Sequence, residues 1–249
     1  MLSRLFRIGR QADPDHLDVA HQGLTYRVAL RRSALARRYT LRGRSAERDV
    51  VLTVPMRGSL RAAREFAASH AGWIAARIAR LPQGRPFAPG ASIPFRGVEH
   101  RLAHETALRG TVRIETAADG APVIVVPSLR EHFARRLTDF LKRQARQDLE
   151  AAALAHAGSL GVTLKRISIK DTTSRWGSCS AKGVLSFSWR LILAPPHVLG
   201  YLAAHETAHR VEMNHSNRYW KLLHSISPDV DRAEAWLKRH GAELHLYGG

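Results

Sequence analysis

The residues with the clearest chemical potential form an H-E-x-x-H pattern at His205, Glu206 and His209. On a helix, residues four apart share one face, so the two imidazoles can present nitrogen atoms to one metal ion. Glu206 lies about 100° around the helix from His205, where its carboxylate can reach a metal-bound water without becoming a ligand. The pattern therefore predicts a helix that carries a hydrolytic metal centre.

A third histidine, His215, follows His209 by six residues. A catalytic zinc site has three protein ligands and one open position, and His215 completes such a set if the helix ends and the chain turns back. We expect the helix to span about residues 197–213, with Asn214 as a left-handed stop. His205, His209 and His215 are thus predicted to bind one Zn²⁺ per chain, with Glu206 as general base.

An earlier segment, His104-Glu105-Thr106-Ala107, repeats the first four residues of the motif. Leu108 stands where the second histidine is needed, and the segment lies in a strand-like region, where residues four apart share no helical face. We therefore expect His104 to be structural.

A second unusual cluster runs from Ser174 to Cys179 and contains Arg175 and Trp176. Arg175 suits either a structural ion pair or the binding of a substrate carboxylate or phosphate. Trp176 can shield the site or fill the core, and the core is the favoured role. Cys179 is expected to be a small buried thiol rather than a ligand or a nucleophile. Arg175, Trp176 and, farther along the chain, Arg218 are the candidate substrate-binding residues.

The elements around these residues predict an α+β protein in three parts. Residues 1–20 read as a weakly ordered basic arm, and residues 21–127 as a β-rich part with one helix, which Ser59 caps and Pro82 stops. Residues 128–249 form the part that carries the H-E-x-x-H helix. In that part we expect a capping box at Ser128 and Glu131, a long helix that ends at Gly158 or Gly161, a strand over 184–193 and a last helix over 231–240 that Gly241 ends.

Composition limits the class of protein. The chain has 249 residues and one cysteine, which excludes an internal disulfide framework and fits a reducing, cytoplasmic location. No apolar run follows the N-terminal arginines and none is long enough to cross a membrane, so we expect neither a secretory signal nor a membrane span.

The net charge of +18 is concentrated early in the chain. Residues 1–150 hold 27 basic and 14 acidic residues, a net charge of +13. This part could bind nucleic acid weakly and without sequence preference, although a solvated basic surface with no dedicated partner is the favoured interpretation.

Taken together, these motifs resemble the YgjP-like metallopeptidase family, a group of bacterial zincins. The resemblance is most specific over residues 165–224 and weaker upstream. It implies a zincin-like catalytic domain over 128–249, zinc on His205, His209 and His215, and Glu206 as general base. Thr207 departs from the family, which usually has an aliphatic residue there. The stretches that carry the resemblance are residues 175–180, 185–187, 190–196, 205–209, 212–216 and 219–220, with 31–33, 39–41 and 71–74 upstream.

The predicted function is a zinc-dependent hydrolase, most simply a metallopeptidase that acts on peptides or proteins. We expect the strand over 184–193 to be an edge that pairs with an extended peptide. The resemblance also brings in a metal-dependent nucleotide pyrophosphatase, which would need a phosphate clamp such as Arg175 or Arg218. A non-enzymatic nucleic-acid-binding protein with structural zinc is a further alternative, but an open coordination position argues against it.

Overall fold

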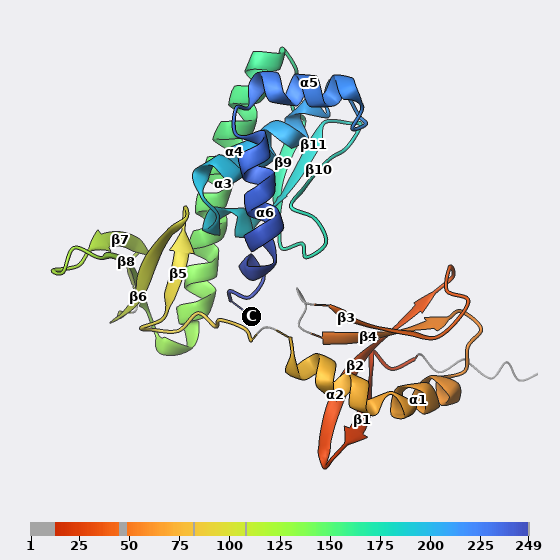
Figure 1. Ribbon diagram of the computed structural model, residues 1–249. Coiled ribbons are helices and arrows are strands. Elements are labelled where there is room, and N and C mark those ends of the chain that lie inside the picture. The colour runs from red at the N-terminus through yellow and green to blue at the C-terminus, as the bar shows by residue number, and fades with distance from the viewer. Residues whose placement is uncertain (1–12, 45–48, 82, 108, 249) are drawn as a thin grey trace, which may run out of the picture. The chain divides into compact units, whose positions relative to one another are not determined.

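The computed structural model describes residues 13–44, 49–81, 83–107 and 109–248. The chain folds as a mixed α+β protein, with a β-rich N-terminal region and helices after it, as the sequence predicts. The chain divides into two compact units, Met1–Gln83 and Gly84–Gly249 (Figure 1). None of the helices in the described ranges is long and apolar enough to span a bilayer.

The first unit is a four-stranded sheet with two helices. Strands β1 (His16–His21), β2 (Leu24–Ser33), β3 (Thr40–Arg44) and β4 (Asp49–Pro55) lie in the order β1-β2-β4-β3, with only the β2–β4 pair parallel. Alternate residues such as Val28 and Leu52 pack on α1 (Leu60–Ser69) and α2 (Ala71–Ala79). The registers place arginines on the opposite face of the sheet: Arg27, Arg31, Arg42 and Arg44.

Two expectations for this unit need correction. Residues 16–20 of the supposed arm belong to β1, because Leu17 and Val19 alternate with exposed residues and are buried; residues 1–12 lie outside the described part. The single helix expected over 59–81 is two helices that meet at His70, although Ser59 caps the first one as predicted.

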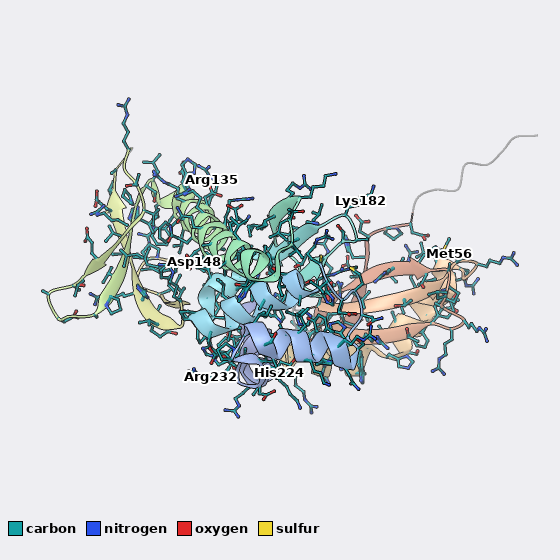
Figure 2. All side chains as sticks on the ribbon, turned by 90° about the horizontal axis from the view of Figure 1, so that it is seen from above. Met56, Arg135, Asp148, Lys182, His224 and Arg232 are labelled. Atoms are coloured by element: carbon teal, nitrogen blue, oxygen red, sulfur yellow. The ribbon has the colours of Figure 1, made fainter. Side chains whose placement is uncertain are left out.

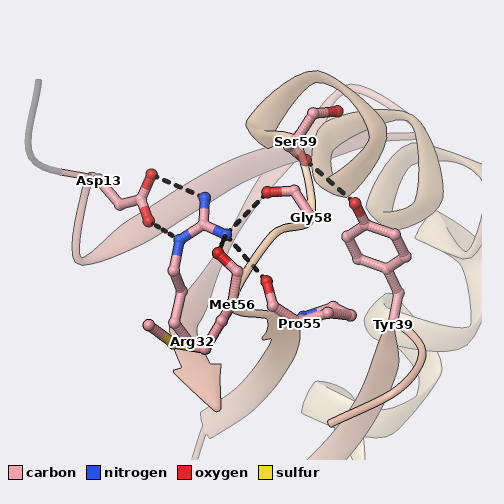
Figure 3. A network of polar contacts seen from close by, with 7 residues as sticks. All are labelled: Asp13, Arg32, Tyr39, Pro55, Met56, Gly58 and Ser59. Carbon is pink, nitrogen blue, oxygen red and sulfur yellow. Dashed lines mark hydrogen bonds and ion pairs between the residues drawn. The ribbon is translucent and has the colours of Figure 1, made fainter. Parts of the chain in front are cut away.

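One arginine of this unit has a purely structural role. Arg32 binds both carboxylate oxygens of Asp13 and donates to the carbonyl oxygens of Pro55, Met56 and Gly58 (Figure 3). These bonds fix the turn that leads from β4 into α1. The charge of Arg32 is therefore neutralised within the fold.

The second unit begins with another four-stranded sheet. Its strands β5 (Ser92–Phe95), β6 (Val98–Thr106), β7 (Arg113–Thr116) and β8 (Pro122–Ser128) lie in the order β5-β6-β8-β7. The apolar face of this sheet packs on the long helix α3 (Phe133–Leu160), with Phe95 against Phe140. Asp148 of α3, labelled in Figure 2, binds Arg96 of the β5–β6 turn with both oxygens.

This packing shows that the boundary between the compact units is not the one predicted between residues 127 and 128. The sheet and α3 share one hydrophobic core, so the compact boundary lies instead at Gln83 and Gly84. The expected capping box is also wrong. Ser128 ends β8 with a buried hydroxyl that has no partner in the described chain, a 3₁₀ turn (Arg130–His132) follows, and α3 begins at Phe133 and is capped by Gly161 in the left-handed conformation.

A three-stranded sheet covers the other end of α3. Strands β9 (Arg166–Lys170), β10 (Gly177–Cys179) and β11 (Val184–Ser188) lie in the order β10-β11-β9, with β11 antiparallel to β10 and parallel to β9. The long strand expected over 184–193 ends at Ser188, and a 3₁₀ turn (Trp189–Leu193) follows. β11 is therefore the central strand of its sheet and not an edge, because Phe187 and Leu185 pair on both sides.

Three helices complete the unit: α4 (Pro196–Ala208), α5 (Asn217–Ile226) and α6 (Val230–Leu244). α4 packs against α3, α5 and α6 and has apolar residues on all sides, as a helix buried in a core does. It ends at Ala208, earlier than predicted, and Asn214 is not in a left-handed conformation. Gly241 lies inside α6 and does not end it.

Candidate metal centre

The C-terminal end of α4 presents the two motif histidines. The helix starts at Pro195-Pro196, where proline fits the first turn, and is buried along most of its length. His205 is half-buried on its last turn, and His209 is the C-cap residue. Both imidazoles lie at the one end of α4 from which the chain turns back.

The turn after α4 brings His215 to the same place. The amides of Arg210, Val211 and Glu212 donate to carbonyl oxygens of the last helical turn, which reverses the chain within a few residues. Ser216 then caps α5, its hydroxyl accepting from the Tyr219 amide. One ligand atom from each of the three histidines lies within 4.8 Å of the others.

The distances between the rings suit a small cation. The Nε2 atoms of His205 and His215 are 3.2 Å apart, while two nitrogens of a tetrahedral zinc site are separated by about 3.3 Å for Zn–N bonds of about 2.0 Å. Three imidazoles are a donor set that zinc accepts readily. The residues present therefore fit the metal that the motif implies.

In two of the rings, a hydrogen bond to Nδ1 leaves Nε2 available for a metal ion. His209 Nδ1 donates to the Glu212 carbonyl oxygen at 3.0 Å, which leaves Nε2 as the free ligand atom. His205 Nδ1 lies 3.3 Å from the Tyr201 hydroxyl, and that hydroxyl donates to Glu234 at 2.8 Å. A carboxylate at the end of such a chain holds the Nδ1–H tautomer and strengthens the ligand.

Burial keeps these imidazoles neutral. It lowers the pKa of His205 to about 4, an effect that the neighbouring His209 and His215 increase. Burial also lowers the pKa of His209, although the bond to Glu212 opposes this. Neutral imidazole is the form that binds a metal ion.

Glu206 is buried beside the histidines, with only 5% of its surface exposed. Burial raises its pKa to about 7, and the positive charge of Arg175 works in the opposite direction. Gly177 of β10 lies so close that a Cβ atom there would be 2.7 Å from Cγ of Glu206. The carboxylate therefore lies between α4 and the edge strand, with a pKa near neutral pH.

Thr207, where the chain departs from the family pattern, is fully buried. It lies about 200° around α4 from His205, on the other side of the helix. Its hydroxyl has no hydrogen-bond partner among the described residues. An unpaired buried hydroxyl destabilises the fold. The metal-binding geometry does not involve Thr207.

The other candidate residues have different positions. Trp176 stacks on His245 at 4.7 Å and packs on Gly241, which supports the core role. Arg175 lines a pocket beside β10. Arg218 lies in the first turn of α5, and within the described residues no hydrogen bond or ion pair joins it to the triad. Cys179 is half-buried on β10, and burial raises the pKa of its thiol.

His104 is structural, as predicted. It lies on β6, its Nε2 binds the Ser128 carbonyl oxygen at 2.8 Å, and its ring packs on Phe133. Glu105 pairs with Arg113 on a neighbouring part of the sheet. No second imidazole of the described chain joins His104 in a metal-binding cluster.

Sequence reasoning missed three residues that support the site. Tyr201 precedes His205 by four positions, a spacing that could have indicated a shared face. Tyr219 stacks on His209 at 4.6 Å and donates to the His205 carbonyl oxygen at 3.0 Å. Glu234 comes from α6, and nothing in its local sequence connects it with the motif.

Comparisons with known proteins identify the family of this chain. No curated protein matches the chain. A crystal structure of the metallopeptidase zymogen abylysin of Pyrococcus abyssi is 20% identical with a TM-score of 0.34, over 39% of this chain and 94% of that one. The family model of the YgjP-like metallopeptidase domain matches residues 38–240, which include the three histidines and parts of both compact units. With most of its length matched, this chain belongs to the YgjP-like metallopeptidase family.

Proposed function

We propose that the protein is a zinc-dependent metallopeptidase in which His205, His209 and His215 bind one Zn²⁺ and Glu206 is the general base. The observation that carries the proposal is the convergence of three imidazoles beside a buried carboxylate. Bound zinc lowers the pKa of water to about 7 and polarises the carbonyl group of the scissile bond.

Glu206 supplies the proton transfers. A general base is most effective when its pKa lies near the working pH, and burial raises the pKa of Glu206 to about 7. The carboxylate accepts the proton of the attacking water and then donates it to the leaving amine. The buried position between α4 and β10 holds Glu206 in place for both transfers.

The outer edge of β10 is the best place for an extended peptide. β11 has partners on both sides, while β10 pairs only with β11 among the described strands. A peptide that adds to this edge gains main-chain hydrogen bonds, and Gly177 brings that edge next to Glu206. The scissile bond would then pass the carboxylate and the histidines.

The test is a Glu206→Gln variant, assayed on casein and on peptides. Gln is nearly isosteric but cannot accept the proton, so zinc content should stay at about one ion per chain while hydrolysis falls by about 10²–10⁴-fold. A His205→Ala variant, which should lose the metal, controls for contaminating protease. Full peptidase activity in a zinc-loaded Glu206→Gln protein would overturn the proposal.

Nucleoside triphosphates, assayed beside casein with zinc and with magnesium, test the alternative hydrolase. Cleavage of nucleotides and not of peptides, with the same loss in Glu206→Gln, would assign the site to that chemistry. A protein with structural zinc alone would show no hydrolysis in either assay.

A further inference from the structure

A pocket of about 230 Å³ lies beside β10, apart from the three histidines. Its walls come from the loop between β9 and β10 and from the outer face of the three-stranded sheet. Leu185 and Phe187 of β11 have their side chains in the core, so Ser186 between them and Ser178 opposite it face the other way. The lining residues are Lys170, Thr172, Ser174, Arg175, Ser178, Ser186 and Phe187.

Two side chains of this pocket, Lys170 and Arg175, are positively charged. Within the described residues, neither Lys170 nor Arg175 makes an ion pair. Asp171, which lies next to Lys170, is held by Arg190 through bonds of 2.9 and 3.5 Å, and the Arg190 side chain is only 10% exposed. The carboxylate of Asp171 is therefore already paired with Arg190, and the side chains that line the pocket have a net positive charge.

Hydroxyl groups add hydrogen-bond donors. Ser168 donates to the Leu185 carbonyl oxygen and lies 2.8 Å from the Ser186 hydroxyl, so those two serines satisfy each other. Ser178, in the same cross-strand row, has no hydrogen bond from its hydroxyl within the described chain and is free to donate. Thr172 donates to the Arg175 carbonyl oxygen at 2.9 Å, which fixes the loop that carries the guanidinium group.

The pocket borders the candidate active site. Arg175 is two residues from Gly177, which contacts Glu206, and the charge of Arg175 acts on that carboxylate. A peptide paired with the outer edge of β10 has alternate side chains on the two faces of the sheet. The side chains on the Ser178 face would be directed toward Lys170 and Arg175.

We propose that this pocket binds a carboxylate of the peptide substrate, held by Lys170, Arg175 and the Ser178 hydroxyl. A planar carboxylate accepts two hydrogen bonds from a guanidinium group and further bonds from an ammonium and a hydroxyl group. The inference rests on the proposed peptidase function and narrows it to acidic peptides. The carboxylate comes either from an Asp or Glu side chain or from the C-terminus of the peptide.

The experiment uses a set of quenched fluorogenic peptides with Glu or Gln at each position in turn, each with a free and with an amidated C-terminus. The wild-type enzyme should cleave one acidic peptide with a kcat/KM at least tenfold above that of its Gln partner, since a charged hydrogen bond contributes about 1.5–3 kcal/mol. A preference for internal Glu identifies a side-chain carboxylate, and a preference for the free terminus identifies the chain end.

Lys170→Met and Arg175→Met should each reduce this preference by about tenfold, and Arg175→Glu should favour a peptide with Lys at the same position. Lys182→Met is the matched control, because Lys182 lies on the β10–β11 turn outside the pocket (Figure 2). It removes the same charge and should leave the preference unchanged. An acidic preference that survives in Lys170→Met and Arg175→Met, or no preference in the wild type, would overturn the assignment.

Binding separates this inference from the proposed function. Fluorescence anisotropy uses peptides of the same sequences that carry a fluorophore and no quencher. With the zinc-loaded Glu206→Gln protein, the acidic peptide should bind more tightly, dependent on Arg175. If no peptide is cleaved but this binding remains, the peptidase proposal fails and the pocket stands. If peptides are cleaved but acidic and neutral ones bind equally, the pocket assignment fails and the peptidase proposal stands.

Discussion

Gly177 and Glu206 lie in contact across the gap between β10 and α4, at a distance that leaves no room for a Cβ atom. The close approach places the edge of a three-residue strand directly beside the carboxylate. It also buries Glu206, and that burial raises its pKa to about 7. The absence of a side chain at Gly177 thus allows the buried position of the proposed base.

Gly177→Ala should therefore disturb catalysis more than metal binding. The added methyl group forces Glu206 or β10 to move, and we expect kcat to fall at least tenfold, within the about 10²–10⁴-fold range of general-base catalysis, while zinc content stays near that of the wild type. Gly200→Ala is the matched control, because Gly200 lies on α4 and its added Cβ would have no atom within 4 Å beyond its chain neighbours and the backbone of its own helix. Equal activities of the two variants would contradict the contact.

His209→Ala should lose most of its zinc. The remaining two histidines provide too few ligands for a catalytic zinc site, and metal analysis after dialysis measures the loss. His104→Ala, in the incomplete copy of the motif, should keep the zinc of the wild type because its imidazole binds the Ser128 carbonyl oxygen. Zinc loss in His104→Ala without unfolding would show that the wrong histidine pair was assigned.

Tyr201→Phe should weaken zinc binding without removing a ligand. The variant breaks the chain from His205 through the Tyr201 hydroxyl to Glu234, and such supporting bonds contribute about 10–100-fold to metal affinity. Competition with a chromogenic chelator measures the affinity. Asp231→Asn is the control. Asp231 lines the same pocket as Tyr201 and Glu234 but takes no part in the hydrogen bonds that lead from Glu234 to His205. Unchanged affinity in Tyr201→Phe would exclude a positioning role.

The stability of the metal-free protein should reveal the charge state of Glu206. Because its pKa is raised from 4.5 to about 7, the folded protein binds the proton more tightly than the unfolded chain. This stabilisation is complete below pH 4.5 and is lost as the pH rises through 7, by about 3 kcal/mol in all. Glu206→Gln lacks this loss, so its free energy of unfolding relative to the wild type should increase between pH 5 and pH 8. A constant difference would contradict the raised pKa.

Nucleic-acid binding by the basic part over residues 1–150 should depend steeply on salt, because phosphate contacts release counterions. Arg31 and Arg42 lie on the sheet face opposite the helices, whereas Arg32 is neutralised by Asp13. The double variant Arg31→Gln and Arg42→Gln should reduce the salt slope of the full chain by about 2. Arg232→Gln, on α6, should not change it. No binding of DNA or RNA at low salt would leave the charge as a solvated surface.

The sequence alone determined the features that depend on local spacing. Four-residue spacing put His205 and His209 at one end of a helix, and six further residues brought His215 within reach. Ser59 identified the start of α1. The absence of a second histidine correctly set His104 apart. Such features could be read from the chain because helix geometry and capping involve residues only a few positions apart.

Only the tertiary structure decided what depends on distant partners. β11 is a central strand because β9 and β10 pair with its two sides, and alternation of side chains cannot distinguish a central from an edge strand. The sheet of β5–β8 joins the second unit because its apolar face meets α3. Gly177 and Glu234 reach the site from β10 and α6, through packing that brings residues close in space across long stretches of chain.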